Sequence, residues 1–182
     1  MFHRSERLFL RPAWPEDWEA IYRGISDEET VHNLARAPWP YEPEHARDFT
    51  NRAQDQFLPN FVVTLPEDGV IGSAGMGIDE ATEQVQMGYW IARDYWGRGY
   101  ATEAARAVLS VAKAIGHKRI TASHFVDNPG SGKVLRKAGF QPTGEIRPGF
   151  SLARGRRDPV ACFEVILDPE GDVGGSEMRQ AA

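Results

Sequence analysis

The stretch DYWGRGYATEAARAVLSVAKAIG, residues 94–116, decides the fold. Two glycines, Gly97 and Gly99, come directly before an alanine-rich segment whose apolar residues recur at three- and four-residue steps. The apolar stripe consists of Ala101, Ala104, Ala105, Val108, Ala112 and Ile115. This spacing predicts an amphipathic helix, which Gly116 can end. The chain thus places its most flexible residues where a helix must begin.

Glycines at the start of a helix are typical of sites that hold phosphate. The first helical turn leaves backbone N–H groups unpaired, and the helix dipole adds partial positive charge there. Glycine lets a ligand approach these N–H groups because it has no Cβ. Arg98 adds a cationic side chain beside them. The stretch therefore predicts a phosphate site, and a helix start that is only structural remains the simple alternative.

Two well-known phosphate motifs fit this sequence poorly. The dinucleotide fingerprint G-x-G-x-x-G requires a third glycine where Thr102 stands, and no acidic residue follows a second strand at the expected place. The P-loop is suggested by GSGK at residues 130–133. However, its first glycine would be Asp127, and Val134 stands where Ser or Thr is required. The P-loop is therefore excluded, and the dinucleotide fold is disfavoured.

Hydrophobic periodicity and turn residues predict the elements around this helix. The expected strands cover residues 6–11, 61–65, 70–78, 85–92, 119–126, 150–153 and 160–167. The expected helices cover residues 15–24, 27–34, 46–57, 101–115 and 131–138. This order predicts a mixed α/β domain around one central sheet. We expect a single domain over residues 1–168 and a disordered polar tail over residues 169–182.

Composition limits the classes of function. The 182 residues are 41% hydrophobic and 26% charged, and the apolar runs are far shorter than the roughly 20 residues of a membrane span. The single cysteine, Cys162, can form no internal disulfide and has no companion for a metal site. Residues 1–12 hold no continuous apolar region of signal-peptide type. We therefore expect a cytoplasmic protein with no metal and no membrane partner.

The charge is distributed unevenly. The net charge is −5, which argues against a general nucleic-acid binder. Residues 93–157 hold 13 Lys and Arg against 4 Asp and Glu, a net of +9, so the rest of the chain carries −14. This asymmetry indicates a polyanionic ligand on one half of the domain, with a solvated basic face as the alternative.

Two motifs together resemble one known family. The stretch GYWIARDYWGRGYATEA at residues 88–104 resembles the acyl-CoA-binding motif Q/R-x-x-G-x-G/A of the GNAT superfamily of N-acetyltransferases, and the RimJ/RimL-like branch in particular. A second motif, NPGSGKVLRKAGF, follows at residues 128–140. Asp94 departs from the family, which prefers Gln or Arg there. The resemblance implies an α/β (α+β mixed) fold with a central, mostly antiparallel, splayed sheet of about seven strands flanked by helices.

The same resemblance implies an acetyl-CoA site. In the family pattern, a strand end corresponding to Trp90, Ile91 and Ala92 pairs its backbone with pantetheine. N–H groups of the glycine turn hold the pyrophosphate, and here the matching residues are Gly97, Arg98, Gly99, Tyr100, Ala101 and Thr102. Asn128 corresponds to the residue that hydrogen-bonds the pantetheine arm. A plain turn before a helix is the other interpretation of Asn128.

The implied reaction is direct attack of an amine on the acetyl carbonyl. The resemblance to RimL-type enzymes makes Ser131 the candidate general acid, with a purely structural hydroxyl as the alternative. Many relatives carry a glutamate near the position of Gln86, and glutamine cannot accept a proton. Glu83 lies just upstream and is a weak candidate for the base. Without an evident base, the sequence favours weakly basic amines such as peptide α-amines.

The acceptor is expected to be a peptide or small-molecule amine. The early helices and the C-terminal hairpin vary within the family, so we expect the acceptor side to include Arg36, Trp39, Tyr41, His124 and Arg154. A homodimer is compatible with the resemblance, because dimers are common in that family. The alternative function is a non-catalytic acyl-CoA-binding sensor on the same fold, because a fold does not guarantee chemistry.

Overall fold

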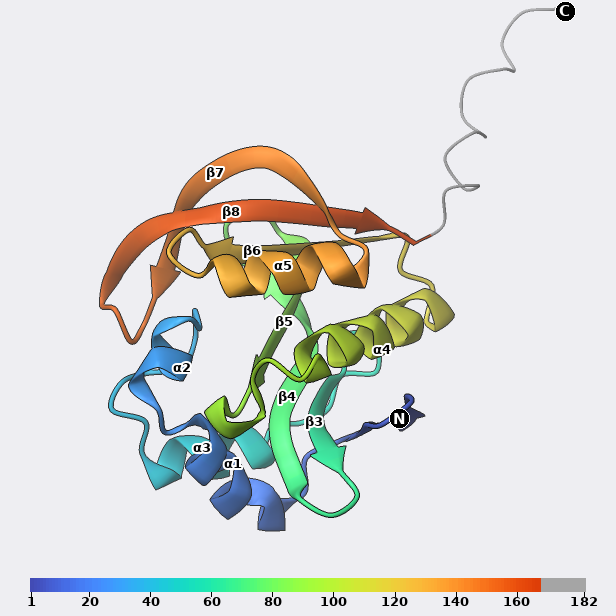
Figure 1. The fold of residues 1–182 in the computed structure, drawn as a ribbon, viewed down its shortest axis with the longest axis vertical. Helices are drawn as coiled ribbons and strands as arrows, with labels where there is room; N and C mark the ends of the chain where they lie inside the picture. Colours follow the sequence, from blue (N-terminus) through green and yellow to red (C-terminus); the bar gives the residue numbers. More distant parts are fainter. Residues whose placement is uncertain (168–182) are drawn as a thin grey trace, which may run out of the picture.

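The computed structural model describes residues 1–167 and shows one sheet with helices on both faces (Figure 1). The eight strands are β1 (His3–Arg4), β2 (Phe9–Arg11), β3 (Asn60–Leu65), β4 (Gly69–Asp79), β5 (Gln84–Ile91), β6 (Arg119–Phe125), β7 (Gln141–Ser151) and β8 (Arg156–Ile166). Their order in the sheet is β1-β2-β3-β4-β5-β6-β8-β7. All neighbours are antiparallel except β5 and β6, which are parallel. The expected fold class is thus confirmed, with the two-residue strand β1 added. The tail over residues 169–182 lies outside the described residues.

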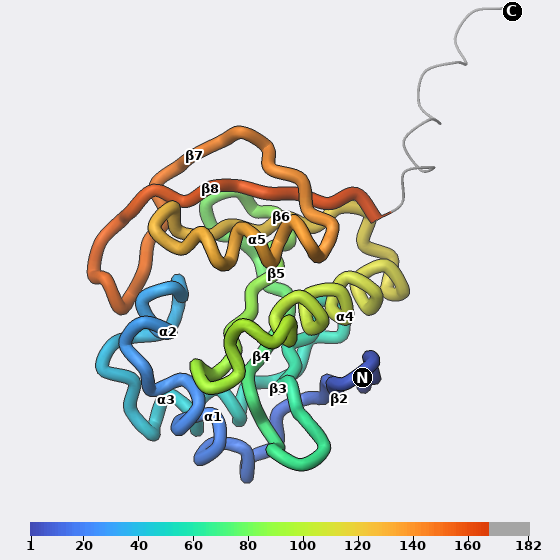
Figure 2. The backbone as a smooth tube through the Cα atoms, viewed as in Figure 1, coloured from blue at the N-terminus to red at the C-terminus, as the bar shows by residue number. Residues whose placement is uncertain are grey.

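The helices follow the order expected from the sequence. They are α1 (Trp18–Ile25), α2 (Glu28–His32), α3 (Pro43–Thr50), α4 (Tyr100–Ala114) and α5 (Pro129–Ala138). Two single 3₁₀ turns, η1 (Pro15–Asp17) and η2 (Arg93–Tyr95), precede α1 and α4. The backbone trace in Figure 2 shows α4 and α5 beside the central strands and the short helices α1 to α3 grouped at one end. Among the described residues, no helix combines the length and the apolar character needed to cross a membrane.

Two hydrophobic clusters lie on opposite faces of the sheet. Successive side chains of a strand point to opposite faces, and in β3 the neighbours Phe61 and Val62 belong to different clusters. The larger cluster contains the alanine-rich side of α4, together with Leu135 of α5. The smaller cluster contains Ile21 of α1 and Ala46 of α3. Small alanines on α4 let this helix lie close to the strands, which fixes the position of its N-terminus relative to β5.

The largest differences from the boundaries expected from the sequence concern α3 and β7. The third helix was expected over residues 46–57, but α3 ends at Thr50, and Phe57 lies exposed in the loop beyond it. The strand expected at residues 150–153 begins nine residues earlier, at Gln141. The ladder between β7 and β8 shifts register between Pro142 and Ile146, so an irregular but paired strand replaces the expected loop.

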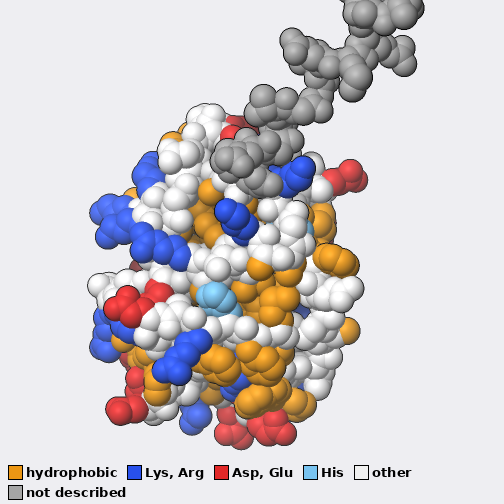
Figure 3. All heavy atoms as spheres, turned by 90° about the vertical axis from the view of Figure 1, so that its right-hand side faces the viewer, with side chains coloured by type: hydrophobic (Ala, Val, Ile, Leu, Met, Phe, Trp, Pro, Cys, Tyr) orange, Lys and Arg blue, Asp and Glu red, His pale blue; other side chains and the backbone are white. Residues whose placement is uncertain are grey.

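In the face shown by Figure 3, hydrophobic side chains form a broad patch.

Candidate active site

The central sheet opens between β5 and β6. The only register pair that joins these strands in the described residues is Gln86 with Thr121, supported by a 3.0 Å hydrogen bond from Thr121 Oγ1 to the carbonyl of Val85. Beyond this point β5 stays paired with β4 up to Ile91, and β6 stays paired with β8 up to Phe125. The two strands therefore separate while each keeps its outer neighbour. This divergence is the splay that the resemblance implied.

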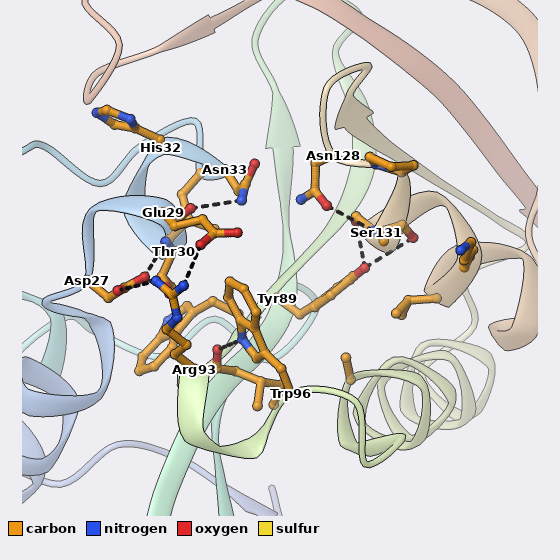
Figure 4. Close-up of a pocket in the computed structure, with 18 of the residues that line it drawn as sticks. Asp27, Glu29, Thr30, His32, Asn33, Tyr89, Arg93, Trp96, Asn128 and Ser131 are labelled. Carbon is orange, nitrogen blue, oxygen red and sulfur yellow. Dashed lines mark hydrogen bonds and ion pairs between the residues drawn. The ribbon is translucent and has the colours of Figure 1, made fainter.

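A cleft of ≈ 1320 Å³ occupies this opening. It is bordered by the end of β5, the glycine turn and start of α4, the start of α5, the helix α2 and the β7–β8 hairpin. Figure 4 shows side chains from α2, β5 and α5 arranged around it. Eight of the ten residues expected to contact acetyl-CoA line this cleft: Trp90, Ile91, Gly97, Gly99, Tyr100, Ala101, Thr102 and Asn128. Ala92 and Arg98 are not among the lining residues; the buried Ala92 instead donates its N–H to Ile71.

The glycine turn has a conformation that requires glycine. Gly97 has φ = 75° and Gly99 has φ = 84°, in the left-handed region that other residues adopt at a cost. Gly99 is the N-cap of α4, and the first intrahelical bond there runs from the N–H of Glu103 to the carbonyl of Gly99. The N–H groups of Tyr100, Ala101 and Thr102 thus precede the helical ladder and border the cleft. This geometry suits an anion such as a diphosphate.

Asn128 and Ser131 are joined at the start of α5. Asn128 is the N-cap, and its Oδ1 accepts a 3.2 Å hydrogen bond from the N–H of Ser131. Pro129 occupies the first helical position, where its missing N–H costs nothing. Asn128 therefore caps the helix with its oxygen, while its NH₂ group has no protein partner among residues 1–167. The cap holds the Ser131 side chain toward the cleft (Figure 4).

Tyr89 is a residue of the cleft that sequence reasoning missed. Its hydroxyl lies 2.7 Å from Ser131 Oγ, so β5 and α5 are bridged across the cleft by two hydroxyls. Burial raises the pKa of Tyr89 to about 12, against a smaller lowering by the hydrogen bond with Ser131. The phenol therefore stays protonated at any physiological pH and can donate to Ser131. This contact forms only because the fold brings a strand close to a helix that is distant in sequence, and no local motif predicts it.

The α2 side of the cleft is held by ion pairs. Arg93, which follows β5, contacts Asp27 at 3.1 Å and Glu29 at 3.0 Å (Figure 4). Asp27 also caps α2 by accepting the N–H of Thr30 at 2.9 Å. Burial acts to raise the pKa of Asp27, but the hydrogen bonds from Thr30 and Arg93 hold it below its usual range. These contacts fix α2 against the strand that carries Tyr89.

Arg154 joins three elements at the hairpin side of the cleft. Its guanidinium binds both carboxylate oxygens of Asp127, at 2.7 and 3.0 Å, and also Asp158 at 3.0 Å. Its Nε donates to the carbonyl of His32 at the end of α2, at 2.7 Å. The hydrogen bond from Arg154 lowers the pKa of Asp127. Arg154 lines the cleft, but its donors are engaged by Asp127, Asp158 and the carbonyl of His32.

The other expected acceptor residues lie away from the cleft lining. Tyr41 is buried in the smaller cluster, and Arg36 donates to the carbonyl of Ile78 at 2.5 Å. Trp39 packs edge-on against His32, which does line the cleft, with ring centroids 6.4 Å apart. The ring of His124 contacts Phe163 of the core instead. The geometry brings Arg154 to the cleft and leaves Arg36, Trp39, Tyr41 and His124 outside its lining.

Among residues 1–167, the geometry supplies no evident base. Glu83, the weak candidate, is exposed in the turn between β4 and β5 and does not line the cleft. Gln86 donates to Ser123 Oγ at 3.1 Å and to Asp79 at 3.4 Å, so its amide is engaged beside the splay point. The carboxylates that line the cleft are Asp27, Glu28, Glu29 and Asp127. Each of these lies beside an arginine or a histidine.

Comparisons with known proteins agree with this architecture. N-acetyltransferase p20 of Bacillus licheniformis, itself described as uncharacterized, is 30% identical over 89% of this chain and 94% of that protein. The crystal structure of a GNAT-family acetyltransferase from Bacillus anthracis is 25% identical, with a TM-score of 0.78 over 92% of this chain and 99% of that one. RimL, the ribosomal L7/L12 α-N-protein acetyltransferase solved with coenzyme A, shares the fold with a TM-score of 0.74 at 18% identity, over 92% of this chain and 99% of that one.

A family description matches the part of the chain that builds the cleft. The acetyltransferase (GNAT) domain covers residues 7–141, from the strand β2 region to the end of α5. This range includes the splayed strands, the glycine turn and the Tyr89–Ser131 pair. The chain therefore belongs to the GNAT acetyltransferases, a family of enzymes that transfer acetyl groups.

Proposed function

We propose that this protein is an acetyl-CoA-dependent N-acetyltransferase that acts on weakly basic primary amines, above all the α-amine of a peptide or protein, in the manner of the RimJ/RimL-like branch. One observation carries the proposal. The cleft that opens between β5 and β6 has the unpaired N–H groups of α4 on one wall and the Tyr89–Ser131 pair on another. A thioester with a diphosphate at its far end matches both features.

The residues of the cleft fit coenzyme A. The N–H groups of residues 100–102 and the glycine turn offer donors to the diphosphate. The backbone of Trp90 and Ile91, which β6 no longer pairs, offers partners to the amide groups of pantetheine. The free NH₂ group of Asn128 offers one more. When bound, acetyl-CoA supplies an acetyl thioester that an amine can attack.

Ser131 and Tyr89 provide a path for one proton. In the transfer the amine nitrogen forms a bond to the acetyl carbon, the carbon–sulfur bond breaks, and the thiolate must gain a proton. Ser131 Oγ–H donates this proton, and Tyr89, held neutral by its pKa of about 12, donates to Ser131 Oγ as the proton leaves. The proton lost by the amine passes to water, and water returns a proton to the Tyr89–Ser131 pair, so charge and atoms balance.

The lack of an evident base favours weakly basic acceptors. An α-amine with a pKa near 8 is about one-tenth neutral at pH 7, whereas a lysine amine with a pKa near 10.4 is neutral at about one part in 2,500. Without a base, the barrier therefore rises by about 1.3 kcal/mol for an α-amine and by about 4.6 kcal/mol for lysine. The carboxylates of the cleft are engaged with Arg93, Arg154 and His32.

Thiol release from acetyl-CoA over a panel of acceptors tests the proposal. The panel contains a peptide with a free α-amine and no lysine, the same peptide N-terminally blocked with one internal lysine, and a small polyamine. We expect turnover with the free α-amine and little with the blocked lysine peptide at pH 7. Calorimetry that detects CoA binding without turnover of any acceptor would favour an acyl-CoA sensor. If CoA does not bind, the proposed site is wrong.

A further inference from the structure

A second, smaller cleft adjoins the first one at the N-terminus of α4. Its volume is ≈ 500 Å³, and it is lined by His3, Ser5, Glu6, Arg7, Gly99, Thr102, Glu103, Arg106, Ala107 and Lys137. Three of these residues, Gly99, Thr102 and Lys137, also line the main cleft. The two clefts therefore meet on either side of the first turn of α4. The N-terminal segment that carries His3 and Arg7 forms the outer wall of the smaller one.

Arg7 is fixed at this junction with part of its guanidinium free. Its Nε binds Glu103 at 2.8 Å, and its Nη1 donates to the carbonyl of Arg98 at 3.1 Å. Nη2 has no hydrogen-bond partner among residues 1–167 and lies 3.5 Å from the position that a Cβ on Gly99 would occupy. The same guanidinium lies 4.5 Å from the ring centroid of Tyr100. One donor of Arg7 is thus held beside the helix N-terminus.

Two acidic residues line this cleft: Glu6 is exposed, and Glu103 is already satisfied by hydrogen bonds. Glu103 accepts hydrogen bonds from Ser5 Oγ at 2.8 Å and from the N–H of Arg7 at 2.7 Å, besides its bond to the guanidinium. Burial acts to raise the pKa of Glu103, but these hydrogen bonds hold it below its usual range. Glu103 therefore stays charged and holds Arg7 in place. The Glu103 carboxylate thus fixes the position of the Arg7 guanidinium.

Two further cations face the same cleft from α4 and α5. Arg106 donates one Nη2 hydrogen bond to the carbonyl of Lys137 at 2.6 Å, which joins the two helices. Both side chains are exposed, and among the described residues neither takes part in an ion pair. Arg7, Arg106 and Lys137 thus converge on one hollow, in which Glu103 is saturated and the exposed Glu6 offsets one of the three positive charges. A compact dianion is the ligand that this arrangement suits.

We propose that this cleft binds the 3′-phosphate of coenzyme A and makes the enzyme prefer CoA over 3′-dephospho-CoA. The inference rests on the proposed function. If the diphosphate lies on the N–H groups of residues 100–102 and the thioester points toward Ser131, the nucleotide end leaves the main cleft on the other side of that helical turn. The shared residues Gly99, Thr102 and Lys137 mark this exit. A phosphomonoester there carries a charge of about −1.5 to −2 at pH 7.

Calorimetry with CoA and with 3′-dephospho-CoA tests the proposal. For the unchanged protein we expect CoA to bind about tenfold more tightly, because charge-assisted hydrogen bonds at a partly exposed site are weakened by solvent. Arg106→Gln combined with Lys137→Gln should reduce this ratio to about twofold or less, by weakening the binding of CoA alone. Lys113→Gln is the matched control: it removes one charge from the exposed face of α4 outside both clefts and should leave the ratio unchanged.

The outcomes separate this inference from the proposed function. Equal affinities for the two ligands in the unchanged protein would overturn the 3′-phosphate site and leave the acetyltransferase proposal standing. A preference that survives the double substitution would place the 3′-phosphate elsewhere and would also overturn the inference. Binding of neither ligand would overturn the proposed function itself. Circular dichroism of each variant identifies any loss of folding, which is not expected because both residues are exposed.

Discussion

Tyr89 Oη lies 2.7 Å from Ser131 Oγ, and this pair connects β5 with α5 at the level where the sheet is open. The two residues come from different halves of the splayed sheet. Tyr89 lies on β5, which ends the half formed by β1 to β5, and Ser131 lies on α5, which follows β6 of the other half. Because burial holds the phenol neutral, Tyr89 is the donor that the pair can supply to a developing charge on Ser131. The hydrogen bond gives the serine a definite orientation, and in the proposed reaction it also gives the serine a source of a proton.

Replacement of Ser131 by alanine should lower turnover without changing CoA affinity. General acid catalysis contributes about 100-fold or more, so we expect kcat to fall by about that factor. Calorimetry should give a Kd for CoA within about twofold of the original, because the phosphate donors are untouched. Ser110→Ala, at an exposed position on α4, is the matched control and should change neither quantity. An unchanged rate for Ser131→Ala would remove this hydroxyl from the mechanism.

Tyr89→Phe should lower kcat by about tenfold and leave Ser131 in place, because it removes one hydrogen bond to a charged transition state. The pH profile gives a second readout. The protonated phenol is the useful form, and its pKa of about 12 means that this form is lost only as pH rises toward 12. For an α-amine with a pKa near 8, we therefore expect kcat/KM to rise with amine deprotonation up to about pH 9 and then to stay level, with no descending limb up to pH 10. A descending limb near pH 10 that disappears in Tyr89→Phe would contradict the raised pKa.

Gly99→Ala should weaken CoA binding, whereas Gly116→Ala should not. Both glycines flank α4 with positive φ, 84° and 95°, so alanine at either position should lower the free energy of unfolding by about 1 kcal/mol. Only Gly99 borders the cleft. Chemical denaturation should therefore report similar losses of stability, while calorimetry separates the two variants. Equal CoA affinities would show that the glycine turn does not hold the ligand.

Arg154→Ala should destabilise the protein and raise the KM for the acceptor. The substitution leaves the carbonyl of His32 without its donor and Asp158 with Arg156 alone, and we expect a loss of about 2 kcal/mol in the free energy of unfolding. Arg154→Lys keeps the charge but cannot reproduce the bidentate contact with Asp127, so it should recover stability only in part. Urea denaturation and acceptor titrations measure both effects. If Arg154→Lys matched the original protein in both, the geometry of the guanidinium would be unimportant.

Local signals allowed much of the fold to be predicted. The glycine turn, the alanine stripe of α4 and the alternating strands β3 to β6 depend on neighbours in sequence, and the structure confirms them. β7 was predicted too short because Pro142, Gly144 and Pro148 read as loop residues. Its pairing with the distant strand β8 overrides that preference. The C-terminal end of α3 was missed because the apolar spacing continues to Phe57, although the helix stops at Thr50.

The site residues that belong to a sequence motif could be predicted. The residues that reach the site only through tertiary contacts could not. Gly97, Gly99 and Asn128 lie on the cleft because each motif fixes its own helix start. The partner of Ser131 could not be found, since Tyr89 lies 42 residues earlier in the chain and meets it only across the cleft between β5 and α5. The expected acceptor residues Arg36 and Tyr41 are engaged by the protein itself, which sequence cannot reveal.

The single register pair between β5 and β6 has a consequence for the molecule as a whole. A bound pantetheine chain that hydrogen-bonds to the free edge of β5 would serve as the missing rung of the ladder and link the two halves of the sheet. Cofactor binding should then slow amide hydrogen exchange along Tyr89–Ile91 and in β6, far from the phosphates. The ligand would act as a temporary structural strand as well as a reactant.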